Sequence, residues 1–148
     1  MVEAFAMLHQ ASQTLQARAL KAGLHDITGK VSGWLDSQRL GTGLLTIFCA
    51  HTSASLVIQE NAAPAARRDL EDFFERIAPQ DPALYTHNDE GPDDMPAHIR
   101  SALTHTQLSI PIDNGRMALG TWQGIFLFEH RDDTPSRRIV LHFVGERR

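Results

Sequence analysis

Four histidines of this 148-residue chain stand where an apolar stretch meets a polar one. His51 follows LLTIFCA, His87 and His98 flank the acidic loop NDEGPDD, and His130 ends the apolar run GIFLF. Functional side chains are often held at such junctions, where a rigid element meets a loop. Three imidazoles from separate elements suit Zn²⁺ with one open position, the arrangement of a catalytic site. The sequence therefore predicts metal ligation by His87, His98 and His130, although no histidine pair has the i, i+4 spacing of a helical zinc motif.

Acid–base chemistry has candidates beside these ligands. Glu90 and Glu129 are predicted as partners of the ligands or as proton carriers. His51 is predicted as a proton carrier or a ligand contact, separate from the metal ligands, and an ordinary imidazole titrates near pH 6.5, where acid–base work is easy. Asp93 and Asp94 have an equally good structural explanation, since acidic residues before a helix stabilise its positive end.

A serine nucleophile is the alternative chemistry. Ser53 and Ser55 follow His51 closely, but the chain has no G-x-S-x-G elbow to present a nucleophilic serine. The sequence favours the metal over this alternative.

The composition limits the kinds of partner. The net charge is −4 and no stretch concentrates Lys and Arg, so no nucleic-acid partner is expected. No apolar run approaches the roughly 20 residues of a membrane helix, and no secretory signal is visible. The single cysteine excludes an internal disulfide. We therefore expect one domain over residues 1–148 and a cytoplasmic location.

The elements that must position these residues alternate irregularly between helix and strand. Propensity predicts a helix over the first twenty-odd residues, and apolar spacing predicts short helices after Thr28, after Pro64 and after Pro96. The helix after Pro64 is expected to bury Leu70, Phe73, Phe74 and Ile77, and the helix after Pro96 is expected to bury Ile99, Ala102 and Leu103. Strands are predicted over LLTIFCAHTSASLVIQ, LSIPI, RMALGTWQGIFLFEHR and RRIVLHFVG, with a hairpin turn at Asp113-Asn114-Gly115. This order predicts an α+β fold with a mainly antiparallel sheet.

Several long motifs resemble those of the YjbQ family, whose members are often labelled secondary thiamine-phosphate synthases. They are HTSASLVIQEN, H-x-x-E-G with DEGPDDMPAHIRSAL, IPI…GR and GTWQGIFLFEHR, and the resemblance runs from about Gly23 to Glu146. Residues 1–10 form an extra segment before the usual family start. The resemblance implies an antiparallel α+β fold, a strand near Thr14 where propensity predicts helix, and a homotrimer.

The resemblance also implies a site. Besides the histidines and glutamates above, it indicates a set of substrate-binding residues together with Glu60: Thr52, Ser53, Asn61, Arg116, Trp122, Gln123 and Arg131. The implied cofactor is a divalent metal, Zn²⁺ first and Mg²⁺ as the alternative with a phosphate substrate. One departure is Ala63, where the family usually has an aspartate before the helix-opening proline.

The implied activity joins a pyrimidine pyrophosphate to a thiazole phosphate to give thiamine phosphate. Such a displacement needs cations for the leaving phosphates, from the metal or from Arg116 and Arg131. Two alternatives remain open: a metal-dependent hydrolase of another small phosphorylated metabolite, and a non-catalytic metal- or metabolite-binding trimer.

Overall fold

Two antiparallel sheets and three α-helices make up the fold, in a computed structural model that describes residues 7–148. The strands are β1 (His9–Ala17), β2 (Gly23–Asp26), β3 (Leu40–Cys49), β4 (Ala54–Glu60), β5 (Gln107–Asp113), β6 (Arg116–Met117), β7 (Gln123–Glu129) and β8 (Arg137–Arg147). The helices are α1 (Thr28–Ser37), α2 (Pro64–Ile77) and α3 (Asp94–Leu103), with a short 3₁₀ turn at Pro82–Leu84. The α+β prediction is confirmed.

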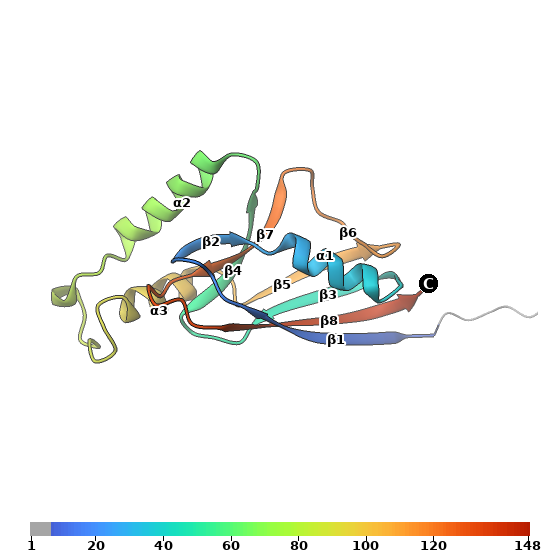
Figure 1. The fold of residues 1–148 in the computed structure, drawn as a ribbon, viewed down its shortest axis with the longest axis horizontal. Coiled ribbons are helices and arrows are strands. Elements are labelled where there is room, and N and C mark those ends of the chain that lie inside the picture. Colours follow the sequence, from blue (N-terminus) through green and yellow to red (C-terminus); the bar gives the residue numbers. More distant parts are fainter. Residues whose placement is uncertain (1–6) are drawn as a thin grey trace, which may run out of the picture.

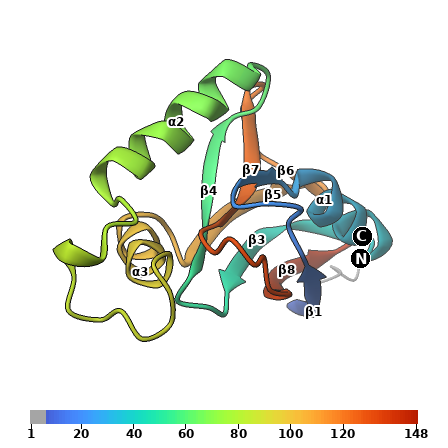
Figure 2. The same cartoon turned by 60° about the vertical axis from the view of Figure 1, so that its left-hand side comes forward.

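The sheets lie one above the other (Figures 1 and 2). The first sheet is five-stranded, in the order β1-β8-β3-β5-β6, and the second is three-stranded, in the order β2-β7-β4. The main core fills the space between them, where Val31 and Leu35 of α1 join apolar side chains of both sheets. A smaller cluster of Leu24, Phe126 and Phe128 lies on the other face of the second sheet, against Leu70 and Phe74 of α2.

Strand β7 therefore has cover on both faces within one chain. Ile125 and Leu127 face the main core, and Phe126 and Phe128 face the α2 side. The uncovered surface lies elsewhere, on the outer face of the first sheet, where Leu44 is 46% exposed and Phe48 is 41% exposed.

Some local expectations hold and others fail. The hairpin turn is confirmed, with Asn114 and Gly115 at φ values of 48° and 81°, as a tight turn between strands requires. The N-terminal helix prediction is wrong where the structure describes it, because β1 pairs along its whole length with β8. That pairing satisfies the backbone groups of β1 that face β8, whereas a lone helix with poor apolar spacing would have little to pack against. The first six residues of the expected extra segment lie outside the described residues.

The buried faces of α2 and α3 also differ from expectation. None of the α2 residues is buried, so its predicted apolar face is only partly covered. Helix α3 begins at Asp94, two residues before Pro96. Its buried residues are Asp94, Pro96, Ala97 and Arg100, whereas Leu103 is 60% exposed. The predicted face is therefore not the buried one, because Ala102 is also exposed and the helix turns Asp94 and Arg100 inward instead.

Finally, no described helix has both the length and the apolar character needed to cross a membrane.

Candidate metal centre

Four side chains from the acidic loop and the first turns of α3 come together in one cluster. His87, Glu90, Asp94 and His98 each offer a ligand atom, and these atoms all lie within 4.8 Å of one another. We refer to these four residues as the acidic-loop cluster. The sequence prediction named three of its members as site residues and weighed a role for Asp94 in the site equally against a structural role at the start of the helix.

Asp94 is the centre of this cluster. Its Oδ2 lies 3.1 Å from Nε2 of His87 and 3.1 Å from Nε2 of His98, and the residue is 2% exposed. Asp94 is also the first residue of α3, so the positive end of the helix favours its negative charge. The carboxylate of Asp94 therefore stabilises the start of α3 and also belongs to the cluster.

The orientation of His98 follows from its second ring nitrogen. Nδ1 of His98 lies 3.1 Å from the Thr52 carbonyl oxygen, which can only accept a hydrogen bond. Nδ1 must therefore donate, and in the neutral ring the lone pair is then on Nε2. That lone pair faces a carboxylate oxygen, so a proton or a cation has to lie between the two atoms.

Charge around Asp94 keeps it ionised. Burial alone would raise the pKa of Asp94, but the positive charges of His98 and Arg131 and the contact with His87 lower it. Arg131 holds the carboxylate from its other side through Nη1 to Oδ1. An ionised carboxylate and two imidazole nitrogens directed at one point form a donor set that suits Zn²⁺.

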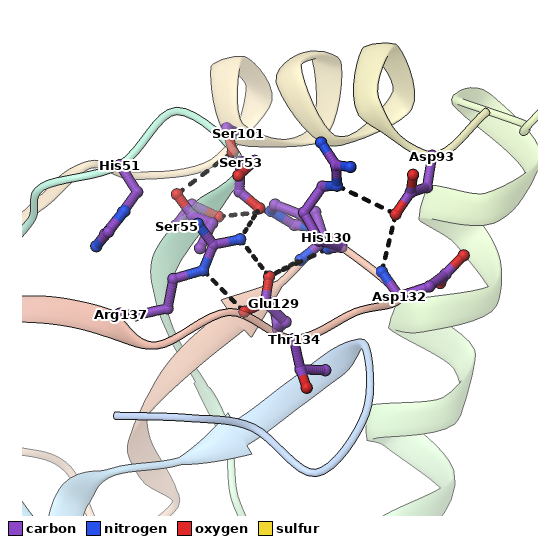
Figure 3. Close-up of polar contacts among 12 residues, drawn as sticks. His51, Ser53, Ser55, Asp93, Ser101, Glu129, His130, Asp132, Thr134 and Arg137 are labelled. Atoms are coloured by element: carbon purple, nitrogen blue, oxygen red, sulfur yellow. Dashed lines mark hydrogen bonds and ion pairs between the residues drawn. The ribbon is translucent and has the colours of Figure 1, made fainter. Parts of the chain in front are cut away.

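Arg131 organises the cluster. Its Nε donates to Asp93 Oδ2 at 3.2 Å and its Nη2 donates to the Glu90 carbonyl oxygen at 3.0 Å, in addition to the contact with Asp94. Asp93 also accepts from the backbone N–H of Asp132 at 2.9 Å (Figure 3). The predicted substrate-binding guanidinium is thus occupied in fixing the acidic loop.

His130, the third predicted ligand, does not belong to the cluster. It is 1% exposed, and its Nε2 lies 2.9 Å from Ser55 Oγ (Figure 3). Burial and the charges of Arg100 and Arg137 lower its pKa to about 3, so the ring is neutral. The structure does not bring His130 to the other two predicted ligands, because the end of β7 points this ring into the protein, against Phe128, with the ring centroids 4.3 Å apart.

The Ser55–His130 pair does not make a catalytic dyad either. Ser55 is 1% exposed and also receives a hydrogen bond of 2.5 Å from Thr104 Oγ1. Nδ1 of His130 has no hydrogen-bond partner in residues 7–148, so no carboxylate orients the ring. A substrate has no access to this pair, and the serine alternative of the sequence loses its support.

Glu129, a predicted catalytic residue, is fully committed to structure. Arg137 donates to it through Nε at 2.8 Å and through Nη2 at 2.5 Å, and the backbone N–H groups of His130 and Arg131 donate to Oε2 at 3.0 and 3.1 Å (Figure 3). The carboxylate is 1% exposed. It ties β7 to β8 and leaves no oxygen free for a substrate.

The remaining predicted residues fall into separate places. Thr52 and Ser53 contribute backbone carbonyls, to His98 and to Arg137 at 3.0 Å. Asn61, Trp122 and Gln123 lie at the far end of the β4–β7 pair, because Glu60 pairs with Gln123 whereas Ala54 pairs with Glu129. Six residues of strand separate these two ends by roughly 20 Å.

Arg116 also lies away from the acidic-loop cluster. It lies on β6, where it lines a separate cavity with Ser32 and Asp36. The structure brings together the acidic loop and α3 but does not bring the Arg116 or Trp122 groups to them within one chain.

Asp94 is the member of the cluster that sequence reasoning underrated. Asp94 and His98 are four residues apart in a helix, which places both side chains on one face. The sequence prediction considered this spacing only between two histidines, so it did not include a pair made of an aspartate and a histidine.

Comparison with known proteins places the chain in a family. The family model described as UPF0047 protein YjbQ-like matches residues 13–146, and the chain belongs to this family. It is 47% identical over 146 residues to UPF0047 protein sll1880 of Synechocystis, covering 99% of each chain. It is 45% identical over 141 residues to UPF0047 protein YjbQ of Escherichia coli O157:H7, covering 95% of this chain and all of that one.

Solved structures agree on the fold. A YjbQ/UPF0047 protein of Clostridium acetobutylicum is 30% identical, with a TM-score of 0.75 over 88% of this chain and 97% of that chain. A protein of Sulfolobus solfataricus, 23% identical, has a TM-score of 0.86 over 95% of this chain and all of that one. The descriptions of these relatives name a family and no activity, so the function has to be argued from the site.

Proposed function

We propose that this protein is a metal-dependent enzyme acting on small phosphorylated metabolites, with the acidic-loop cluster as its metal site. The observation that carries the proposal is the pair of imidazole nitrogens that both lie 3.1 Å from one buried carboxylate oxygen. Three protein ligands that leave one position open are typical of catalytic zinc sites. His87, Asp94 and His98 would provide these ligands, with Mg²⁺ as the alternative ion.

Each residue then has a defined task. A bound divalent ion would supply positive charge for a phosphate oxygen or a polarised water. Glu90 is exposed and belongs to the cluster, so its carboxylate can take up a proton beside the open position. Thr52 fixes the ring of His98 through its carbonyl, and Arg131 fixes Asp94, so that the ligands need little rearrangement.

The thiamine-phosphate synthase reaction is one form of this proposal. It loses the support expected from the two arginines, because Arg131 is bound to Asp93 and Asp94 and Arg116 lies on β6. The metal alone would have to hold the leaving pyrophosphate. Hydrolysis of a phosphorylated metabolite makes a smaller demand on the site, because it needs one cation, one water and one base.

Metal content and turnover test the proposal together. Purified untagged protein should contain one equivalent of zinc by elemental analysis, and it should turn over at least one member of a panel of small phosphate esters that includes thiazole phosphate with pyrimidine pyrophosphate. Glu90→Gln should keep the zinc and lower turnover by about 10²–10⁴-fold, the usual contribution of a general base. Zinc binding without any turnover would favour a non-catalytic metal-binding protein.

We also propose a homotrimer, as the family resemblance implies. Its support in the structure is the uncovered outer face of the first sheet, where Leu44 is exposed beside half-buried Val140 and Val144. Contiguous exposed apolar patches commonly mark interfaces. Light scattering should give three times the 16.5 kDa chain mass, and Leu44→Glu should dissociate the assembly. A wild-type monomer at micromolar concentration would contradict this proposal.

A further inference from the structure

A cavity of about 590 Å³ opens beside the acidic-loop cluster, where the end of β3 meets α3. Its volume falls within the range of small-molecule sites. Its wall is partly apolar, from Phe48, Ala50 and Ala102, and partly polar, from residues that include Ser101 and Thr106. We propose that this cavity binds the carbon skeleton of the substrate, and that the substrate is therefore a small phosphate or other oxyanion with a compact apolar body. The inference rests on the proposed metal site and adds a substrate class to it.

His98 connects the cavity with the cluster. Its ring is part of the cavity wall, while its Nε2 faces Asp94 in the cluster. Thr52, whose carbonyl holds Nδ1 of His98, also lines the cavity. A molecule in the cavity therefore contacts the ring of a proposed metal ligand. An oxyanion at the metal and an apolar body in the cavity can belong to one small molecule.

His51 supplies a polar group to the same cavity, in the second of its two predicted roles, a contact to the ligand. Its Nε2 accepts a hydrogen bond of 2.8 Å from the backbone N–H of Arg138. The proton of the neutral ring is therefore on Nδ1, which has no partner in the described part of the chain. Partial burial and the charges of Arg137 and Arg138 lower the pKa of His51, which favours this neutral form. His51 thus offers a hydrogen-bond donor, whereas a proton carrier would need Nε2 free.

Figure 3 supports this division between the histidines. His51 points away from the buried group formed by Ser55, His130, Glu129 and Arg137. It is half-buried at the wall of the cavity, so a ligand oxygen can reach it.

The apolar walls discriminate between classes of phosphate. Sugar phosphates carry hydroxyl groups all around their carbon skeleton, and those that face Phe48, Ala50 and Ala102 would lose water without gaining partners. An aryl or alkyl phosphate loses only apolar hydration there, which is favourable.

Two phosphonates that differ only in their apolar body test the proposal, because a phosphonate cannot be hydrolysed as an ester. On zinc-loaded protein, phenylphosphonate should bind at least about 10-fold more tightly than methylphosphonate, as burial of an aromatic ring predicts. Ala102→Leu should remove this difference by filling the cavity, and it should leave methylphosphonate binding and zinc content unchanged. Ala65→Leu, at an exposed position of α2, is the matched control and should keep the full difference.

His51→Ala should weaken both phosphonates by about 10-fold through loss of a hydrogen bond to a charged group, with zinc retained. Equal affinity for the two phosphonates on zinc-loaded wild-type protein would overturn the proposed cavity while leaving the metal site intact. Absence of zinc from the wild-type protein would instead overturn the proposed function, and the inference with it.

Discussion

His98 and His130 each have a ring nitrogen within 3.1 Å of a polar side-chain atom, yet the two rings lie in different surroundings. The His98 side chain is 31% exposed and shares an ionised carboxylate with His87. His130 is 1% exposed and faces the hydroxyl of Ser55. The first ring has charge beside it and access to solvent, and the second has neither a carboxylate nor access.

This difference teaches that the partner of an imidazole decides its chemistry more than its place in a motif does. A carboxylate favours a cation between the two groups, so the acidic-loop cluster is suited to hold a metal. A buried hydroxyl favours the neutral ring, so the Ser55–His130 pair is suited to hold strands together. Four variants can break or sharpen this contrast.

Removing the buried guanidinium near His130 should have the largest effect on stability. Arg137→Met leaves the carboxylate of Glu129 buried without its ion-pair partner, which typically costs about 3–5 kcal/mol. Chemical denaturation should show this loss, and the folded fraction should still bind zinc, because no cluster residue contacts Arg137 in the described hydrogen bonds. A loss below about 1 kcal/mol, the value typical of exposed pairs, would mean that the pair is solvated in solution.

Removing an imidazole from the cluster should weaken metal binding and leave the stability of the fold nearly unchanged. His98→Ala should weaken zinc binding by more than about 100-fold, because it removes a ligand itself, whereas loss of a residue that only supports a ligand costs less. The stability of the metal-free protein should change little. Competition with a chromogenic chelator measures this affinity. His130→Gln is the matched comparison and should bind zinc as the wild type does. Equal loss in both variants would mean that the two rings share a metal after all.

The acid side of the stability profile should reveal the buried ring. Above pH 6.5 neither the folded nor the unfolded chain protonates His130. Below pH 6.5, His130 takes up a proton in the unfolded chain, whereas in the folded chain it stays neutral until the pH approaches its lowered pKa of about 3. The free energy of unfolding should therefore fall by up to about 1.4 kcal/mol per pH unit as the pH drops below 6.5. Denaturant titrations between pH 5 and 6.5 should show a flatter slope for His130→Gln, and identical slopes would place the ring in contact with water.

The smallest effect is expected far from both histidines. Ala63 precedes α2 without a side-chain cap, while its N–H bonds to the Glu60 carboxylate. Ala63→Asp introduces a side chain that can cap the helix and should stabilise the protein by about 1 kcal/mol. Thermal unfolding measures the gain, and zinc affinity should stay constant. A change in zinc affinity would link α2 to the cluster.

Local chemistry in the sequence predicted much of the fold. The Asn-Gly turn, the proline that opens α2 and the alternating strands each express a backbone preference that tertiary contacts did not reverse. The strand β1 needed the family resemblance, because its pairing with β8 brings together residues more than a hundred positions apart. No local pattern carries such a pairing.

The candidate site was predictable to the extent that one continuous segment builds it. His87, Glu90 and His98 lie within twelve residues, and the loop and the start of α3 bring them together. His130 was assigned by its position after β7, and position along a strand does not reveal whether the last side chain turns into the core. Arg131 pairs with carboxylates from a distant part of the sequence, whereas Glu129 pairs with Arg137 across the turn into β8, and no local pattern marked either pairing.

Helix α2 has a consequence for how the molecule moves. None of its residues is buried, and it is anchored by the Glu71 carboxylate accepting the Leu24 N–H at 2.8 Å and by edge contacts such as Phe74 on Phe128. Segments with little buried surface open at a lower free energy than the core. In the isolated chain, the amide hydrogens of α2 should exchange with solvent long before those of β3 and β8. Each such opening exposes Phe126 and Phe128 while both sheets stay folded, so the helix is the protein's most accessible route to a partly unfolded state.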